Sequence, residues 1–239
     1  MKQILIDKYL EKHGYTEWEP KVALFDMDGV LYDSMPNHAK AWHDSMALYG
    51  VEMSEAEAYA FEGMRGFETI KIVAGRQWGR TVTDEESNDM YRVKSEHYAA
   101  CPTAGLIPGV KALQEEMLRL GLRIGVVTGS GQHSLLERLQ RDFQGLISPE
   151  IFVTALNISR GKPAPDPYLM GMSMAGTEPW QTIVVENAPL GVRAGVAAGC
   201  FTVAVNTGPL PDEILANEGA EIVLHNMDEF RQLLPELIP

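Results

Sequence analysis

The stretch VALFDMDGV at residues 22–30 decides how we interpret this sequence. Four apolar residues without a polar interruption are typical of a strand that is buried on both faces of a parallel sheet. Two acids follow at once, Asp26 and Asp28, with one residue between them. Ligands of open α/β sheets bind just beyond the carboxyl ends of the strands, so both acids are placed for chemistry.

Two carboxylates this close repel each other unless a cation lies between them. Oxygen ligands of this kind suit a divalent metal, and Mg²⁺ is the ion that we expect. An acidic turn after a strand is the plainer interpretation of the same residues. An EF-hand loop fits less well, because its glycine stands at about position 6, whereas Gly29 is the fourth residue counted from Asp26.

The composition limits the class of protein. The chain has 239 residues, 45% of them hydrophobic, which suits one or two globular domains with a sizeable core. Its formal charge of −13 argues against binding to nucleic acid or to an anionic membrane. No apolar run approaches the roughly 20 residues of a membrane span, and residues 1–18 lack a signal-peptide core. We therefore expect a cytoplasmic protein; the oligomeric state stays open, and a monomer is compatible with the sequence.

Beyond residue 105, strand and helix patterns alternate along the chain. Apolar runs that fit strands lie at 123–128, 151–153, 183–185, 201–205 and 222–224. Helical patterns separate these runs, and Asp166 and Pro167 open one of them, with the aspartate as its cap. This alternation predicts an α/β fold with a doubly wound parallel sheet.

Residues 35–103 follow a different, purely helical pattern. Capping boxes of the form S/T-x-x-E begin at Ser54 and Thr83, and each predicts the start of a helix. We expect this segment to be a helical cap domain over the carboxyl edge of the sheet. The core domain would then comprise residues 1–34 and 104–239, with a short amphipathic helix within residues 1–20 that carries no assigned chemistry.

Three more strand ends carry polar residues that suit phosphate and metal chemistry. They are Thr128, Gly129 and Ser130 after one strand, Lys162 after the next, and Glu186 and Asn187 after another. A hydroxyl with exposed amides can bind phosphate oxygens, and acid and amide oxygens can bind Mg²⁺. Taken singly, the same residues are a strand-to-helix turn, a solvated lysine and a helix cap.

Together with Asp26 and Asp28, these residues resemble the motif set of the haloacid dehalogenase superfamily. The motifs D-x-D-G-V, strand-end Thr, G-K-P-x-P-D and strand-end E-[DN] match over residues 21–225. The sequence FDMDGVL, together with a helical cap between the first two motifs, resembles the β-phosphoglucomutase-like phosphatase subfamily. The core of that subfamily is a Rossmann-like sheet.

The resemblance implies covalent catalysis on a small phosphorylated substrate. Asp26 would attack phosphorus and form an aspartyl-phosphate, while Asp28 would act as general acid and base. Thr128 and Lys162 would hold the phosphoryl oxygens, helped by the Gly129 and Ser130 amides. The implied Mg²⁺ ligands are Asp26, the Asp28 carbonyl, Glu186 and Asn187.

Many family members carry Asp where this chain has Asn187, which removes one charge from the metal site. We hypothesise that Glu62 of the cap restores this charge by reaching the metal or its waters; a solvated glutamate at a helix end is the alternative. His38 matches a histidine at the cap hinge, or is a packed core histidine. Arg65 and Lys94 would meet the distal end of an anionic substrate, or are lone surface cations.

Mutases of this subfamily carry Gly-x-Ser-Arg where this chain reads GMRG at residues 63–66. The missing arginine argues against recognition of a second sugar phosphate, unless Arg65 substitutes from its shifted position. We therefore place hydrolysis of inorganic pyrophosphate or a sugar phosphate before β-phosphoglucomutase activity. A dinucleotide-binding oxidoreductase that uses Gly129, Ser130 and Gly131, and a phospho-acceptor signalling domain, are the alternatives from other classes.

Overall fold

The computed structural model describes residues 2–130 and 134–238. Within these residues six strands form one parallel sheet in the order β3-β2-β1-β4-β5-β6. The strands are β1 (Val22–Phe25), β2 (Arg123–Val127), β3 (Phe152–Val153), β4 (Thr182–Glu186), β5 (Phe201–Val205) and β6 (Ile222–Leu224). The prediction of an α/β fold with a doubly wound parallel sheet is confirmed.

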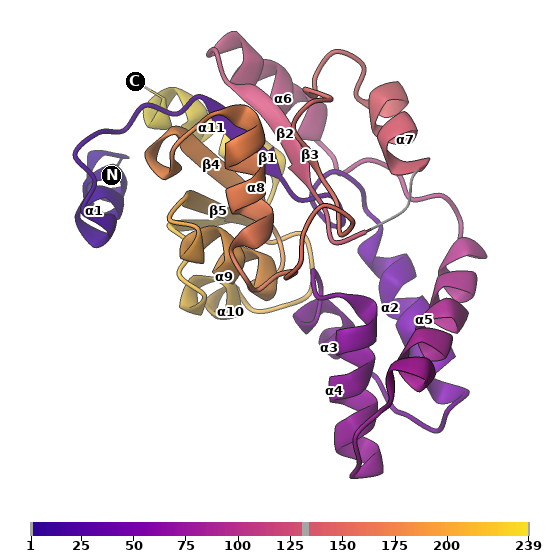
Figure 1. The fold of residues 1–239 in the computed structure, drawn as a ribbon. Coiled ribbons are helices and arrows are strands. Elements are labelled where there is room, and N and C mark those ends of the chain that lie inside the picture. The colour runs from indigo at the N-terminus through magenta and orange to yellow at the C-terminus, as the bar shows by residue number, and fades with distance from the viewer. Residues whose placement is uncertain (1, 131–133, 239) are drawn as a thin grey trace.

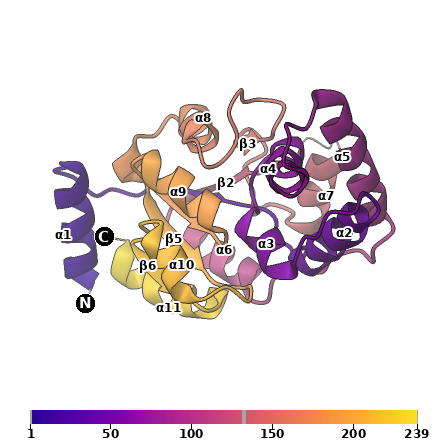
Figure 2. The same cartoon turned by 90° about the horizontal axis from the view of Figure 1, so that it is seen from below.

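Helices cover both faces of this sheet (Figures 1 and 2). The helices outside residues 35–103 are α1 (Lys2–His13), α6 (Val110–Arg119), α7 (Ser134–Asp142), α8 (Asp166–Ala175), α9 (Pro189–Ala197), α10 (Asp212–Asn217) and α11 (Met227–Leu237), with a 3₁₀ turn at Pro179–Gln181. Successive side chains of a strand point to opposite faces. Ala23 and Phe25 accordingly pack in the apolar cluster with α6 and α11, whereas Leu24 packs in the cluster with α8.

The cap helices lie to one side of the sheet and have an apolar cluster of their own (Figure 1). They are α2 (Met35–Ala47), α3 (Glu55–Ala60), α4 (Gly66–Trp78) and α5 (Asp84–Ala99). Both predicted capping boxes are present, at Ser54 and at Thr83, because each side chain accepts from the backbone amide three residues on and each glutamate returns the bond. The segment between β1 and β2 is helical as predicted.

The loop after β5 contacts both the cap and the turn that follows β1. Thr207 Oγ1 donates to the Gly29 carbonyl at 2.6 Å. The next residue, Gly208, lies under the ring of Tyr59, so that a Cβ there would come within 2.9 Å of that ring. Leu210 also packs against the apolar cluster of the cap. One short loop thus joins three parts of the structure.

Two local findings complete the fold. Helix α1 lies on the side of the sheet away from the cap, and Tyr9 fastens it by donating to the Gly199 carbonyl at 2.8 Å (Figure 2). The prediction of Asp166 as a helix cap is wrong: Pro165 is the cap residue, without a side-chain hydrogen bond. The Asp166 carboxylate instead accepts from Arg160 at 2.9 Å, because it lies inside the first turn and faces that loop.

Candidate active site

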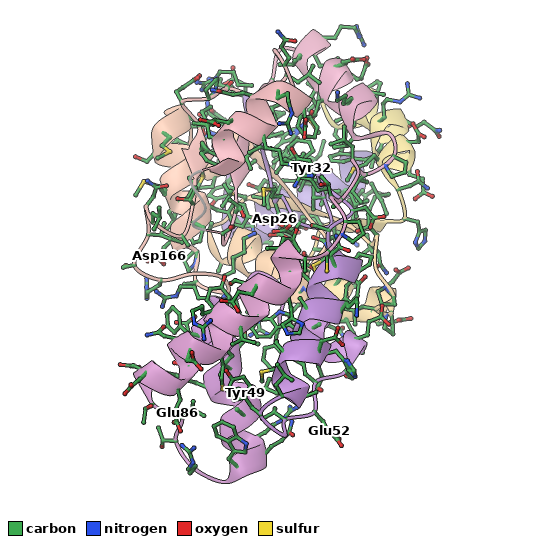
Figure 3. The ribbon with its side chains drawn as sticks, turned by 90° about the vertical axis from the view of Figure 1, so that its right-hand side faces the viewer. Asp26, Tyr32, Tyr49, Glu52, Glu86 and Asp166 are labelled. Carbon is green, nitrogen blue, oxygen red and sulfur yellow. The ribbon has the colours of Figure 1, made fainter. Side chains whose placement is uncertain are left out.

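The predicted strand-end residues meet at the carboxyl edge of the sheet. Strands β2, β1 and β4 are neighbours, so Thr128, Asp26 and Glu186 come together where these strands end. Lys162 reaches the same place from the loop between β3 and α8. All four side chains are buried. Figure 3 shows Asp26 between the sheet and the cap helices, far from Glu86 at the outer end of the cap.

Lys162 joins two of the acids. Its ammonium contacts Asp26 Oδ1 and lies 2.6 Å from Glu186 Oε1. Although burial opposes it, these two carboxylates hold the pKa of Lys162 above its usual value. A permanent cation is therefore fixed beside Asp26.

Glu186 is held by four donors. Its Oε1 accepts from Lys162 and from the Tyr168 hydroxyl, each at 2.6 Å. Its Oε2 accepts from the backbone amides of Asn187 at 3.1 Å and Ala188 at 3.4 Å, where α9 begins. Gly191 leaves the room for this carboxylate, since a Cβ at that position would lie 1.9 Å from Oε1. Both oxygens of Glu186 are thus already in use.

The site carries more negative charge than Lys162 compensates. Burial raises the pKa of Asp26 to about 8, with Lys162 opposing and the neighbouring Glu186 and Asp28 adding to the rise. Burial, with repulsion from Asp26 and Asp28, also raises the pKa of Glu62 well above its usual value. A divalent cation would relieve this repulsion.

The cap places Glu62 directly against Asn187. The Asn187 Nδ2 donates to Glu62 Oε2 at 3.0 Å, and both side chains are buried. In the described part of the chain, Glu62 Oε1 and Asn187 Oδ1 have no hydrogen-bond partner. Two buried oxygens without a donor are the atoms that a hard cation such as Mg²⁺ would satisfy. The residues present therefore fit the expected metal.

The candidate metal ligands do not form a complete coordination site built from acidic side chains alone. Within residues 2–130 and 134–238, no three His, Cys, Asp or Glu side chains converge on one metal position. The expected set includes an amide and a main-chain carbonyl, and the Lys162 ammonium lies between Asp26 and Glu186. Mg²⁺ sites commonly use one or two carboxylates and keep several waters, so this arrangement is compatible with the ion.

A chain of polar contacts orients Asp28. Its Oδ1 accepts from Ser34 Oγ at 2.5 Å and lies 3.4 Å from His38 Nε2. Lys94 Nζ donates to His38 Nδ1 at 2.7 Å, so a neutral His38 carries its proton on Nε2 and presents it to Asp28. Although burial opposes it, His38 and Ser34 lower the pKa of Asp28 to about 2. In this state Asp28 is a carboxylate that can accept a proton.

The phosphate-binding candidates lie under the cap backbone. The Ser130 amide donates to Thr128 Oγ1 at 3.1 Å, which fixes the hydroxyl at the end of β2. The Gly63 carbonyl lies over Gly129, where a Cβ would come within 3.2 Å of it. Gly63 itself has φ +84° and lies against the stem of Lys162. Gly131, which the dinucleotide interpretation needs, lies outside the described residues.

A cavity of about 140 Å³ separates the cap from the core above Asp26. The predicted residues that line it are Asp26, Asp28, His38, Glu62, Lys94, Gly129 and Ser130. The aromatic residues of the remaining wall include Trp42, Tyr91 and Tyr98. The cavity thus reaches from the paired acids to a cationic and aromatic wall.

Arg65 lies away from this cavity, contrary to its predicted place at the distal end of a substrate. Its guanidinium donates to the Ser159 carbonyl at 3.0 Å and pairs with Glu68. It also covers the ring of Phe67 at 5.0 Å. Arg65 is the N-terminal capping residue of helix α4. Its side chain runs along the outside of the cap domain towards the core loop that contains Ser159.

Three residues of the site escaped the sequence argument: Ser34, Tyr168 and Arg138. Ser34 stands in a segment that we interpreted only as a break in the pattern, yet its hydroxyl contacts Asp28. Tyr168 sits within an apolar helix, which gives no sign that its hydroxyl reaches Glu186. Arg138 lies in a helix whose charged sequence is typical of a solvent-exposed helix, yet its side chain lines the cavity.

Comparison with known proteins agrees with this geometry. A family model described as haloacid dehalogenase-like hydrolase matches residues 23–205. The chain belongs to this family. The resemblance read from the motifs is confirmed, and this member of the haloacid dehalogenase-like hydrolases is an enzyme of the phosphatase or phosphomutase type.

Its relatives include both types. Hexitol phosphatase A of Escherichia coli K12 is 33% identical over 208 residues, covering 86% of this chain and 91% of that protein. Beta-phosphoglucomutase of Bacillus subtilis 168 is 24% identical and covers 87% of this chain and 94% of that protein. A solved structure of a beta-phosphoglucomutase-like protein from Bacteroides vulgatus is 46% identical with a TM-score of 0.94, covering 99% and 96% of the two chains.

Among residues 2–130 and 134–238, no helix of this family member is both long and apolar enough to cross a bilayer.

Proposed function

We propose that this chain is a Mg²⁺-dependent phosphohydrolase that cleaves a small phosphate compound through an aspartyl-phosphate on Asp26. The observation that carries the proposal is the buried Asp26 carboxylate, paired with Lys162 and facing a small cavity under the cap. Such a carboxylate can attack phosphorus, while the neighbouring cation stabilises the charge on the phosphoryl oxygens.

The other residues take roles that their positions support. Thr128 Oγ1 and the Gly129 amide would hold the phosphoryl oxygens, because they lie at the end of the strand next to Asp26. The Ser130 amide, which donates to Thr128 Oγ1 in this structure, would have to exchange that acceptor for a phosphoryl oxygen when substrate binds. Asp28 would accept a proton from water in the second step, since Ser34 and His38 keep it ionised. Water would then release phosphate from Asp26.

Mg²⁺, when bound, would supply charge that offsets repulsion between the carboxylates and the phosphoryl group. Asp26 and the Asp28 carbonyl would hold it from the core, with Asn187 Oδ1 and Glu62 Oε1 as the buried oxygens that lack a partner. Glu186 would act through Lys162, because four donors already occupy its carboxylate. This changes the role of Glu186 from a direct ligand to a residue that positions the lysine.

Three observations support a small leaving group and hydrolysis over mutase activity. A cavity of about 150 Å³ accommodates a molecule the size of benzene, and the cavity here is about 140 Å³. Arg65, the substitute for the mutase arginine, is held outside it by Glu68 and Ser159. Asp28 is also a poor proton donor while Ser34 and His38 bind it, and a phosphate leaving group needs less protonation than a sugar alkoxide. Inorganic pyrophosphate is therefore the first substrate to test.

The test is a phosphate-release assay with Mg²⁺ on pyrophosphate, sorbitol 6-phosphate and glucose 1-phosphate, the last with and without a bisphosphate primer. We expect phosphate release that needs Mg²⁺, acid-stable label on Asp26 after a rapid quench with ³²P substrate, and loss of both in Asp26→Asn by about 10⁴-fold or more. Conversion of glucose 1-phosphate to glucose 6-phosphate with little free phosphate would overturn hydrolysis. Turnover by Asp26→Asn at the wild-type rate would overturn the covalent mechanism.

A further inference from the structure

A second cation lines the cavity besides Lys94. Arg138 belongs to α7 of the core, whereas Lys94 belongs to α5 of the cap. Both side chains line the same cavity, whose floor is formed by Asp26 and Asp28. The two acids and the two cations therefore line one cavity.

Arg138 is held in place with part of its charge free. Its guanidinium stacks on the Tyr32 ring at 3.9 Å and donates to the Ala104 carbonyl at 2.8 Å. Its Nε is buried and has no hydrogen-bond partner in the described residues, although it forms an ion pair with Asp142 at 3.4 Å. A guanidinium fixed by an aromatic face is pre-organised to bind an anion.

The Asp142 carboxylate does not cancel this charge. It also accepts from Arg141 at 3.0 Å and from the Tyr32 hydroxyl at 3.1 Å. Two arginines thus share one carboxylate, and of these three residues only Arg138 lines the cavity.

Aromatic rings of the cap hold Lys94 in place, as the Tyr32 ring holds Arg138. It is buried, with its ammonium 5.0 Å from the Trp42 ring and 5.2 Å from the Tyr98 ring. Its one hydrogen bond to a side chain in the described residues goes to His38, which leaves two of its three protons for other acceptors. No carboxylate pairs with it directly among the ion pairs of the described residues.

We infer that Arg138 and Lys94 together form a subsite for an anionic group on the leaving group. The inference rests on the proposed function, because it requires the leaving group to occupy the cavity above Asp26. The substrate class is then a phosphate anhydride such as pyrophosphate, or a phosphate ester of an acid, in preference to the phosphate of a neutral sugar alcohol. Arg138 takes the place that the sequence had assigned to Arg65.

The experiment compares Arg138→Gln with Arg141→Gln. Both remove one charge from the same helix and from the same carboxylate, but only the first removes a group that lines the cavity. For each protein, kcat/KM is measured on pyrophosphate and on sorbitol 6-phosphate. We expect Arg138→Gln to lower kcat/KM for pyrophosphate about ten-fold, mainly through KM, and to leave sorbitol 6-phosphate within about two-fold. Arg141→Gln should leave both unchanged.

Equilibrium binding keeps this test independent of turnover. Calorimetric titration with methylenediphosphonate, which is not hydrolysed, should show about ten-fold weaker binding to Arg138→Gln than to wild type. Inorganic phosphate should bind both equally. If the enzyme hydrolyses nothing in the screen, the proposed function fails, while this titration still decides whether Arg138 binds a second anionic group.

Three results would overturn the subsite. They are an equal loss of kcat/KM on both substrates, an equal effect of Arg141→Gln, or unchanged binding of methylenediphosphonate. Should Arg138→Gln lose its folded circular dichroism spectrum, Arg138→Lys serves instead, because it keeps the charge but not the planar stacking on Tyr32. Arg138→Lys should then retain a measurable preference for pyrophosphate over sorbitol 6-phosphate. Loss of that preference would equally contradict the subsite.

Discussion

The two halves of the site differ in how completely their polar groups are partnered. On the core side, Lys162 bridges Asp26 and Glu186, and Glu186 is held by four donors. On the cap side, Glu62 keeps one oxygen without a partner and Lys94 has one side-chain acceptor in the described residues. The network of Lys162, Asp26 and Glu186 is therefore complete before any ligand arrives, whereas in the described part of the chain Glu62 Oε1, together with Asn187 Oδ1 of the core, lacks a partner until metal binds.

This difference separates the residues proposed to carry out the reaction from the residues proposed to select the substrate. A saturated network on strand ends holds its geometry, because each group is fixed by several others. Free donors and acceptors on a helical cap gain their partners only when the cap lies over a ligand. We expect a change in the Lys162 network to affect stability and turnover together, and changes at Glu62 and Lys94 to affect mainly the binding of metal and substrate.

The largest effect should follow from Lys162→Met. It leaves two buried carboxylates without their cation, which costs about 3–5 kcal/mol of unfolding free energy without metal. Turnover should fall by about 10²–10³-fold, because a group that stabilises phosphoryl charge is lost. Urea denaturation without metal, together with the phosphate-release assay, measures both quantities.

The matched control for Lys162→Met is Arg160→Met, which breaks an exposed ion pair in the same loop. It should cost less than about 1 kcal/mol. If Lys162→Met proved as stable as Arg160→Met, the core half would not be the fixed network described here.

Glu62→Gln should change metal binding without loss of stability. The amide keeps the contact with Asn187 but removes a buried carboxyl that its neighbours repel, so the melting temperature without metal should stay equal or rise. The Mg²⁺ concentration for half-maximal activity should rise about ten-fold. Thermal shift with increasing Mg²⁺ gives a second measure that does not need activity.

Glu68→Gln, on the same cap but paired with Arg65, is the control for Glu62→Gln. An unchanged Mg²⁺ dependence in Glu62→Gln, or an equal change in Glu68→Gln, would contradict a role for Glu62 at the metal.

Lys94 gives the cap side a pH dependence. Burial lowers the pKa of Lys94 from the usual 10.5 to about 8, so the side chain loses its charge as the pH rises through 8. The KM for pyrophosphate should therefore increase above pH 8 in wild type, and less so in Lys94→Arg, whose guanidinium stays charged. A parallel increase in both proteins would show that Lys94 does not titrate in the complex.

The same shift has a defined sign for stability. Between about pH 8 and 10.5 the unfolded chain binds more protons at this residue than the folded one. The contribution of Lys94 to the unfolding free energy therefore rises with pH across that window. Urea denaturation of wild type and Lys94→Arg at pH 8 and pH 10 would detect the difference.

The smallest effect should come from Thr83→Ala at the outer end of the cap. Thr83 closes the capping box of α5 with Glu86, at 3.2 Å from the Glu86 amide. Its loss should cost about 1 kcal/mol of stability and leave kcat, KM and Mg²⁺ dependence unchanged. A change in KM would show that the outer cap is coupled to the site.

The sequence was sufficient for the sheet and for most of the core half. Buried parallel strands read as uninterrupted apolar runs, and their carboxyl ends necessarily meet, so Asp26, Thr128 and Glu186 could be placed together without coordinates. The capping boxes at Ser54 and Thr83 were equally readable, because they depend on residues only three positions apart.

The rest depends on where long side chains turn after leaving the backbone. Arg65 could point into the cavity or along the outside of the cap, and only its contacts with Glu68 and Ser159 decide between them. Arg138 and Tyr168 reach the site from helices whose own sequences follow the demands of packing. Contacts between residues distant in the chain leave no local pattern.

The loop after β5 links the turn that carries the proposed catalytic acids to the cap beside the cavity. Gly208 supports the Tyr59 ring from below, and its neighbour Thr207 grips the turn that carries the acids. A side chain at 208 would have to displace the Tyr59 ring, whose neighbour Ala58 lines the cavity. A substitution there would therefore disturb the cap beside the cavity without touching Asp26 or the residues expected to hold the metal.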